Sequence, residues 1–101
     1  MKDLVVHKRF ERDLSRLLKQ IRPQRFDYET LDYVIDLLMR DKPLPESFRP
    51  HALQKRSVNY AGVEECHLDA DVLLLYKLLD DCVVLWRIGT HSFLFAPGKF
   101  R

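Results

Sequence analysis

The sequence has little of what several protein classes require. Its 101 residues include only three glycines and two cysteines, and no glycine-rich loop that would cradle a nucleotide phosphate. Cys66 and Cys82 lie in apolar stretches without the C-x-x-C spacing of a metal site, which indicates reduced core thiols rather than a disulfide framework. Apolar runs such as Val72 to Tyr76 are far too short to cross a bilayer, and no secretory signal is evident. We therefore expect a cytoplasmic protein with no membrane partner.

The length and the charge distribution bound the architecture and the partners. A chain of 101 residues is long enough for one core, so we expect a single domain over residues 1–101 with its active site on the surface of that core. The net charge of +2 identifies no partner, but four basic residues recur at helical spacing and predict a basic stripe: Lys8, Arg12, Arg16 and Lys19. Arg12 and Arg16 are candidate contacts to an RNA backbone. A solvated helix face is the alternative interpretation.

The first half of the chain carries the periodicity of helices. Apolar residues at helical spacing predict an amphipathic helix from Phe10 to Ile21, which Pro23 ends. Asp27 is the expected N-cap of a second helix. The buried stripe of that helix would comprise Leu31, Val34, Ile35 and Leu38. Three prolines then favour an extended loop that brings His51 to the sheet: Pro43, Pro45 and Pro50.

The second half carries the patterns of strands. Runs rich in β-formers predict strands at Val63 to Leu68, Val72 to Leu78, Val83 to Ile88 and Phe93 to Phe95. Their connections are short enough for antiparallel hairpins, and a further short strand is expected at Leu4 to Val6. The predicted fold class is α+β, with a short N-terminal strand and two helices packed on one face of an antiparallel sheet of about four to five strands.

Side-chain alternation predicts where the polar residues of the sheet point. In the strand that ends at Ile88, Trp86 and Ile88 would share one face and Arg87 would lie on the other. The same alternation places His67 opposite Cys66. We therefore expect His67 and Arg87 to lie together on the sheet face that the helices leave uncovered, where they would line an open groove.

These residue types match one reaction class, the cleavage of RNA without a metal ion. The reaction needs a base that takes the proton of the ribose 2′-OH, an acid that protonates the leaving 5′-oxygen, and a cation on the phosphate. Histidine suits both proton transfers because its pKa lies near neutrality, and arginine suits the phosphate because its planar fork donates two hydrogen bonds. Phe95 would add a ring on which an unpaired base stacks. We expect neither a metal ion nor an organic cofactor.

Three blocks of the sequence carry a resemblance to a known family. They read "LPESFRPHAL", "EECHLDADVLLLYKL" and "RIGTHSFLF", and they resemble in order and spacing the signature blocks of the YafQ-like branch of the RelE/ParE toxin superfamily. The resemblance covers the whole chain and implies a RelE-like fold. The chain departs from the family pattern at Glu64, Ala70 and Val72, where arginine, proline and an aromatic residue are usual.

The resemblance implies a bacterial type II toxin, an mRNA endonuclease that cuts in the ribosomal decoding site and that a cognate antitoxin holds inactive. The expected partners are therefore the mRNA, the ribosome and the antitoxin. By position in the blocks, His91 corresponds to the general acid and Arg87 to the residue that holds the scissile phosphate. The general base stays open among three candidates: His51, His67 and Asp71.

Two further family positions, Glu65 and Phe95, are candidate substrate contacts. The wider superfamily also includes non-nucleolytic toxins that bind DNA gyrase, so a ParE-like toxin or a protein-binding module of the same fold is the alternative function. Those proteins usually lack an equivalent histidine set. The presence of His51, His67 and His91 therefore favours the nuclease.

Overall fold

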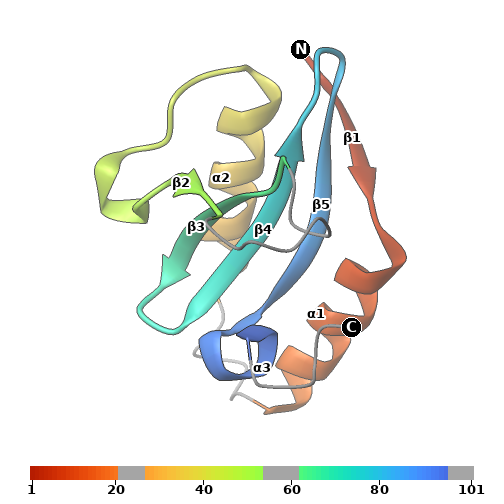
Figure 1. Cartoon of the computed structure of the whole chain (residues 1–101), viewed down its shortest axis with the longest axis vertical. Helices are drawn as coiled ribbons and strands as arrows, with labels where there is room; N and C mark the ends of the chain where they lie inside the picture. Colours follow the sequence, from red (N-terminus) through yellow and green to blue (C-terminus); the bar gives the residue numbers. More distant parts are fainter. Residues whose placement is uncertain (21–26, 54–61, 96–101) are drawn as a thin grey trace.

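The computed structural model describes residues 1–20, 27–53 and 62–95. Its elements follow in the order β1 (Asp3–Val6), α1 (Lys8–Gln20), α2 (Tyr28–Met39), the short 3-10 helix η2 (Glu46–Phe48), β2 (His51–Ala52), β3 (Glu64–Asp69), β4 (Val72–Leu78), β5 (Cys82–Thr90) and α3 (His91–Phe95). The described strands form one sheet in the order β1-β5-β4-β3-β2 (Figure 1). The α+β fold class is therefore confirmed. None of the described helices is long and apolar enough to cross a membrane.

The strands of the second half pair as expected, whereas β1 does not. β2 with β3, β3 with β4, and β4 with β5 are all antiparallel. β1 instead runs parallel to β5, in a register that extends from Asp3 opposite Cys82 to Val6 opposite Leu85. The sheet is mixed rather than wholly antiparallel because helices, not a tight turn, separate β1 from the hairpins. β1 forms one edge of the sheet (Figure 1).

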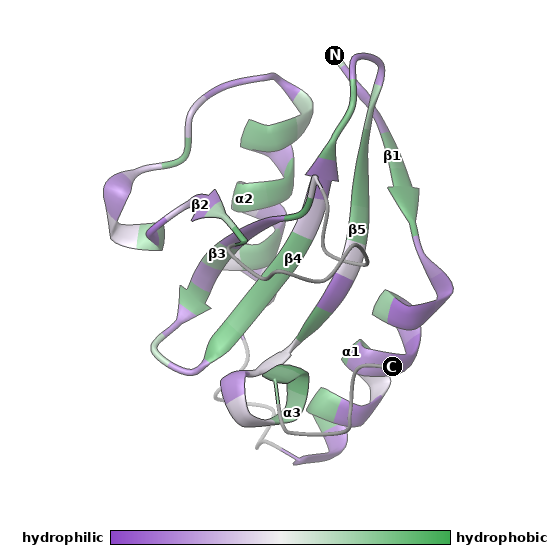
Figure 2. Cartoon of the chain, viewed as in Figure 1, coloured by the Kyte–Doolittle hydropathy of each residue, from purple (hydrophilic) through white to green (hydrophobic). Residues whose placement is uncertain are grey.

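Helices α1 and α2 enclose the main core on one face of the sheet. α1 contributes Phe10 and Leu17, and α2 contributes Leu31, Val34 and Leu38, at the spacing that the sequence shows. Side chains of β3, β4 and β5 pack against them: Cys66, Val72, Leu74, Tyr76, Val83, Leu85 and Ile88. Figure 2 shows β4 as apolar along most of its length, which fits a strand that is covered on both faces.

The starts of the helices follow the sequence signals. Oδ1 of Asp27 accepts hydrogen bonds from the backbone nitrogens of Glu29 (2.9 Å) and Thr30 (3.3 Å), so Asp27 is the N-cap of α2 as expected. α1 is confirmed as an amphipathic helix, but its expected end at Ile21 and Pro23 lies outside the described residues.

Residues His91–Phe95 form the helix α3, so the prediction of a strand from Phe93 to Phe95 is wrong. Oγ1 of Thr90 accepts a hydrogen bond from the backbone nitrogen of Phe93 (3.2 Å) and thereby caps the first turn of α3. A Cβ atom at Gly89 would lie 3.0 Å from Cδ2 of Phe93 and 3.3 Å from Cγ of Leu94. Glycine therefore allows α3 to pack closely against β5.

The sheet face opposite α1 and α2 is consequently not bare, which corrects the prediction of an open groove without helices. Four buried side chains form a second core there: Val63, Leu73, Leu75 and Leu94. Leu94 comes from α3, so α3 covers part of this face, which we call the α3 face. Polar residues of the site must therefore lie beside α3 rather than along a continuous groove.

A β-bulge changes the direction of side chains in β5. Leu75 pairs with Arg87 but the next residue of β4, Tyr76, pairs with Leu85, so Trp86 is an extra residue in β5. Trp86 packs against the second core, whereas Ile88 is buried in the main core. The prediction that Trp86 shares a face with Ile88 is therefore wrong, because simple alternation does not anticipate the extra residue, whereas Arg87 lies opposite Ile88 as expected. The register still places Arg87 on the α3 face, beside Leu75.

Candidate active site

The α3 face brings together candidate residues from three strands, β2, β3 and β5. Paired residues run in one row from His51 on β2 to Glu65 on β3, Leu75 on β4 and Arg87 on β5. Directly paired residues of neighbouring strands point to the same face, and adjacent strands lie about 4.8 Å apart. The backbones at Glu65 and Arg87 are therefore roughly 10 Å apart. His67 follows two residues after Glu65, so it shares this sheet face with Arg87 as expected, in the next row of the face, opposite Leu73.

Three of the candidates form a close cluster. One ligating atom each of His51, Glu65 and His67 lies within 4.8 Å of the others. Nε2 of His67 is 3.7 Å from Oε1 of Glu65, and the rings of His51 and His67 have centroids 6.4 Å apart. Glu65 is 6% exposed, whereas His51 is exposed to solvent. A buried carboxylate thus lies beside a half-buried imidazole, with a second imidazole at the surface.

The environment of His67 favours its neutral form. Burial lowers the pKa of His67, the positive charge of Arg49 acts in the same direction, and the carboxylate of Glu65 opposes both. His51 and His91 add smaller effects that also lower the pKa. Nδ1 of His67 is buried and has no hydrogen-bond partner within the described part of the chain. At neutral pH the ring is therefore uncharged, and a neutral imidazole has a nitrogen that can accept a proton.

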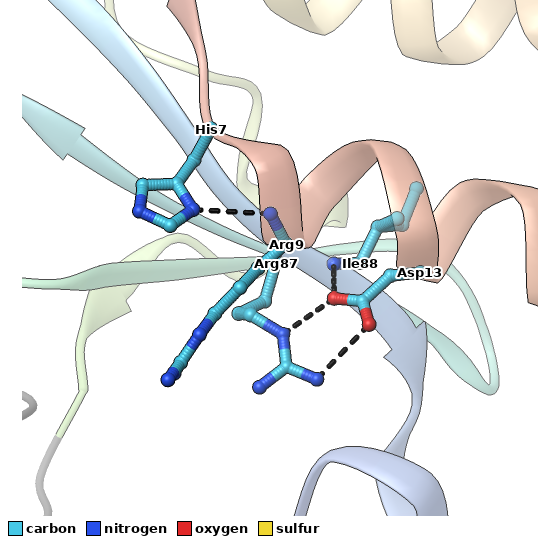
Figure 3. A network of polar contacts seen from close by, with 5 residues as sticks. All are labelled: His7, Arg9, Asp13, Arg87 and Ile88. Atoms are coloured by element: carbon cyan, nitrogen blue, oxygen red, sulfur yellow. Dashed lines mark hydrogen bonds and ion pairs between the residues drawn. The ribbon is translucent and has the colours of Figure 1, made fainter.

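Arg87 is held by a residue that the sequence reasoning missed. Its Nε and Nη2 donate to Oδ2 and Oδ1 of Asp13 on α1, at 2.5 and 2.9 Å (Figure 3). The Arg87 and Asp13 side chains are only 12% and 5% exposed. Asp13 occupies the apolar stripe of α1 between Phe10 and Leu17. A charged residue in the buried phase of an amphipathic helix was the signal that could have identified it.

Asp71 and His91 lie at one end of the sheet. Val72 pairs with Thr90, so Asp71 in the turn before β4 and His91 at the start of α3 flank the same pair. Both are exposed. The ring of His91 has its centroid 5.0 Å from that of Phe95, at an interplanar angle of 55°. Phe95 is partly buried against the second core, so the His91 ring contacts a side chain that the core holds in place.

The basic stripe of α1 divides into two parts. Arg12, Arg16 and Lys19 line a shallow depression of the surface, and all three are exposed. The guanidinium carbon of Arg16 lies 4.7 Å from the centroid of the Phe93 ring, which is a cation–π contact with α3. Arg16 therefore links α1 to α3, whereas no such contact is found for Arg12 within the described residues.

One histidine and both cysteines lie outside the site described above. His7 is exposed, and its Nδ1 accepts a hydrogen bond from the backbone nitrogen of Arg9 (3.1 Å) at the start of α1 (Figure 3). Cys66 is buried in the main core, and burial raises the pKa of its thiol to about 12. Such a thiol stays protonated and is no nucleophile at neutral pH. Cys82 is also a free thiol, with its pKa raised by desolvation and by Asp81.

The sequence matches a known protein family over nearly its whole length. Residues 2–96 match the family described as "Bacterial toxin of type II toxin-antitoxin system, YafQ". The mRNA interferase toxin YafQ of Escherichia coli (strain K12) is 33% identical over 83 residues, which cover 81% of this chain and 87% of that protein.

Solved structures agree with the sequence match. A copper-bound mutant toxin from Helicobacter pylori has a TM-score of 0.81 and 37% identity, and the alignment covers 94% of this chain and 100% of that one. YafQ in the Escherichia coli DinJ-YafQ complex has a TM-score of 0.77 and 30% identity, with 94% and 99% covered. The match extends over nearly the whole chain in both sequence and fold. The chain therefore belongs to the YafQ family of bacterial type II toxins, within the RelE superfamily.

Proposed function

We propose that this toxin is an endoribonuclease that cleaves mRNA in the ribosomal decoding site by general acid and base catalysis. The YafQ relatives from Escherichia coli are named mRNA interferases. The observation that carries the mechanism is the neutral, half-buried His67 beside the buried Glu65, on the same sheet face as His51 and Arg87. A protein-binding module of this fold would have no need for two imidazoles and a carboxylate gathered on the face that carries Arg87.

In the proposed reaction, His67 takes the proton from the ribose 2′-OH. The 2′-oxygen then attacks the adjacent phosphorus, and the bond between phosphorus and the 5′-oxygen breaks. Protonated His91 donates its proton to the departing 5′-oxygen, and Arg87 offsets the negative charge that builds on the phosphate. The products are a 2′,3′-cyclic phosphate and a 5′-hydroxyl, so no water is consumed in this step.

His67 is the best of the three candidates for the base. Its lowered pKa keeps the ring ready to accept a proton at neutral pH, and its partial burial removes competing water. Nδ1 of His51 lies 3.1 Å from the carbonyl oxygen of Ala52, so one of its ring nitrogens has a backbone partner. Asp71 is exposed in a turn. We assign His51 and Asp71 to the binding of the ribose and the flanking nucleotides, and Glu65 to the orientation of His67.

The pH profile of cleavage tests the role of His67. If neutral His67 is the base, the rate rises as pH increases through its pKa. The Glu65 carboxylate raises this pKa against the effect of burial, so Glu65→Gln should lower it further. We expect the acidic limb of the single-turnover rate to move to lower pH in Glu65→Gln, and to stay in place in the neighbouring Glu64→Gln. An acidic limb that Glu65→Gln leaves unmoved would assign the base elsewhere.

The partners follow from the charge of α1 and from the relatives. Since a homologous YafQ is found in complex with DinJ, we propose that a cognate antitoxin binds this toxin in the cytoplasm. An acidic antitoxin segment and the phosphates of mRNA or ribosomal RNA would complement the same exposed residues, Arg12 and Lys19. Arg16 would contribute less to either partner because its guanidinium already stacks on Phe93.

A transition metal would compete with this mechanism. The donors of His51, Glu65 and His67 suit zinc or copper by chemical type, and a related toxin has been crystallised with copper. Separations up to 4.8 Å exceed those around one ion with bonds of about 2.0–2.2 Å, so the side chains would have to turn inward. A bound metal would occupy the nitrogen that accepts the proton. We therefore propose that metal binding at this cluster inhibits cleavage.

A further inference from the structure

We infer that Asp13 is a positioning residue that fixes the orientation of Arg87 for the scissile phosphate. The inference rests on the proposed function, because Arg87 is taken as the phosphate ligand. Asp13 and Glu65 are the two polar or charged residues that are buried in the described part of the chain. Each lies beside a candidate catalytic residue, Asp13 beside Arg87 and Glu65 beside His67. Each of the two buried carboxylates thus contacts one residue that is assigned to the reaction.

The geometry restricts Arg87 in two directions. A bidentate contact through Nε and Nη2 fixes both the plane of the guanidinium and the direction in which it points. Oδ2 of Asp13 also accepts a hydrogen bond from the backbone nitrogen of Ile88 (3.3 Å) (Figure 3). The carboxylate is therefore tied to the same stretch of β5 that carries Arg87. A rotation of the Asp13 side chain would break all three hydrogen bonds.

The position of Asp13 depends on where β1 ends. The pairing of β1 with β5 stops at Val6 opposite Leu85, three residues before Ile88. Beyond that point α1, rather than a strand, lies along this edge of β5, and Asp13 accepts the hydrogen bond that a longer β1 could have accepted. The short first strand thus makes room for a helix carboxylate beside the active-site arginine.

A second contact from α1 completes the arrangement. Arg16, one turn after Asp13, stacks on the Phe93 ring at 4.7 Å, and the guanidinium carbon of Arg87 is 5.9 Å from the same centroid. α1 therefore holds both Arg87 and the α3 ring beside it. An arginine that is oriented before RNA binds loses less side-chain entropy when it contacts the phosphate, and its charge acts on the transition state without reorganisation.

A purely structural ion pair would join α1 to β5 without affecting catalysis, and the two roles predict different results. If Asp13 only stabilises the fold, Asp13→Asn lowers the melting temperature and leaves the cleavage rate of the folded protein unchanged. If Asp13 positions Arg87, the rate falls at saturating programmed ribosomes while the half-saturating concentration changes little. The loss should then disappear in a protein that already lacks Arg87.

The experiment is a double-mutant cycle with Asp13→Asn, Arg87→Gln and both together. Single-turnover cleavage is measured on programmed ribosomes, below the melting temperature of every variant. We expect Asp13→Asn to slow cleavage by roughly 10- to 100-fold, the effect of a misplacement of about 1 Å. In the Arg87→Gln background the same change should alter the rate by less than about threefold. Asp36→Asn, which removes the exposed ion pair with Arg40 (3.0 Å), is the matched control and should leave the rate unchanged.

Two results of the mutant cycle would overturn the inference. One is an Asp13→Asn protein that is less stable but cleaves within about threefold of the wild type. The other is an equal loss of rate in both backgrounds. If Asp13→Asn does not fold, Asp13→Glu keeps the charge while displacing the guanidinium, and it should also slow cleavage.

The exchange of the Arg87 Nε proton with water, followed by NMR without RNA, separates this inference from the proposed function. If this proton exchanges slowly in the wild-type protein but the protein does not cleave RNA, the proposed function alone is refuted. If the proton exchanges freely, the positioning of Arg87 by Asp13 is refuted.

Discussion

Replacement of His91 by glutamine is expected to remove nearly all cleavage while leaving the fold intact. A positioned general acid contributes about 10²- to 10⁴-fold to a proton-transfer step, and glutamine cannot donate a proton to the 5′-oxygen. His91 is exposed at the first position of α3, so its replacement should change the free energy of unfolding by less than about 0.5 kcal/mol. Single-turnover cleavage on programmed ribosomes and thermal unfolding measure the two effects separately.

The matched control for His91 is His7, the other exposed histidine that lies at the start of a helix. His7→Gln should retain cleavage, toxicity and antitoxin binding, because His7 follows β1 at the sheet edge opposite to β2 and β3, which carry His51, Glu65 and His67. Its ring accepts a hydrogen bond from the backbone nitrogen of Arg9, and its own backbone nitrogen, which glutamine keeps, donates to the Leu85 carbonyl oxygen (3.0 Å). Cleavage by His91→Gln within about threefold of the wild type would show that the proton for the 5′-oxygen comes from another group.

Replacement of Arg87 by glutamine is expected to reduce both the rate and the stability. Loss of a charged donor that stabilises the transition state should slow cleavage by about 10²- to 10³-fold. The change also leaves the buried Asp13 carboxylate without its cation, and removal of one partner from a buried ion pair costs about 3–5 kcal/mol in unfolding free energy. Chemical denaturation and single-turnover cleavage, both at a temperature where the variant is folded, test the two expectations.

Arg12→Gln is the control for Arg87, because Arg12 is an exposed arginine on the neighbouring helix. Its stability should change by less than about 0.5 kcal/mol. Arg87→Lys separates the effect of the positive charge from that of the bidentate geometry, since lysine keeps the charge but cannot form the bidentate contact with Asp13. An Arg87→Gln protein as stable as the wild type would mean that the ion pair with Asp13 contributes nothing to the fold, and an unchanged rate would remove Arg87 from the mechanism.

The sequence was sufficient for the elements with strong periodicity. The apolar stripes of α1 and α2 and the cap at Asp27 follow from local chemistry, as do the hairpins of β3, β4 and β5. The wrong prediction of a strand at Phe93 to Phe95 has a local cause that the sequence contains. "FLF" has the composition of a strand, but Thr90 supplies a helix cap and Gly89 permits the close packing that a strand would not need.

The contacts between distant parts of the chain were harder to predict from the sequence. Glu65 and His67 are two residues apart on β3, so alternation alone places them on one face, whereas the proximity of His51 to both depends on the pairing of β2 with β3. The bulge at Trp86 could not be derived from alternation, because an extra residue shows only when two strands are paired. The contact between Asp13 and Arg87 joins residues 74 positions apart. Only the unusual place of an aspartate in an apolar stripe hinted at it.

The most direct test of the account is the chemistry of the cut ends. mRNA is incubated with the toxin on programmed ribosomes and, separately, without ribosomes, after EDTA has removed transition metals and with magnesium kept in excess. Primer extension locates the cut, and end analysis identifies the termini. We predict cleavage on ribosomes only, with a 2′,3′-cyclic phosphate and a 5′-hydroxyl, and slower cleavage when copper is added. Ends with a 5′-phosphate, or a requirement for added zinc or manganese, would contradict the metal-free mechanism, and toxicity without any cut would favour a non-nucleolytic toxin.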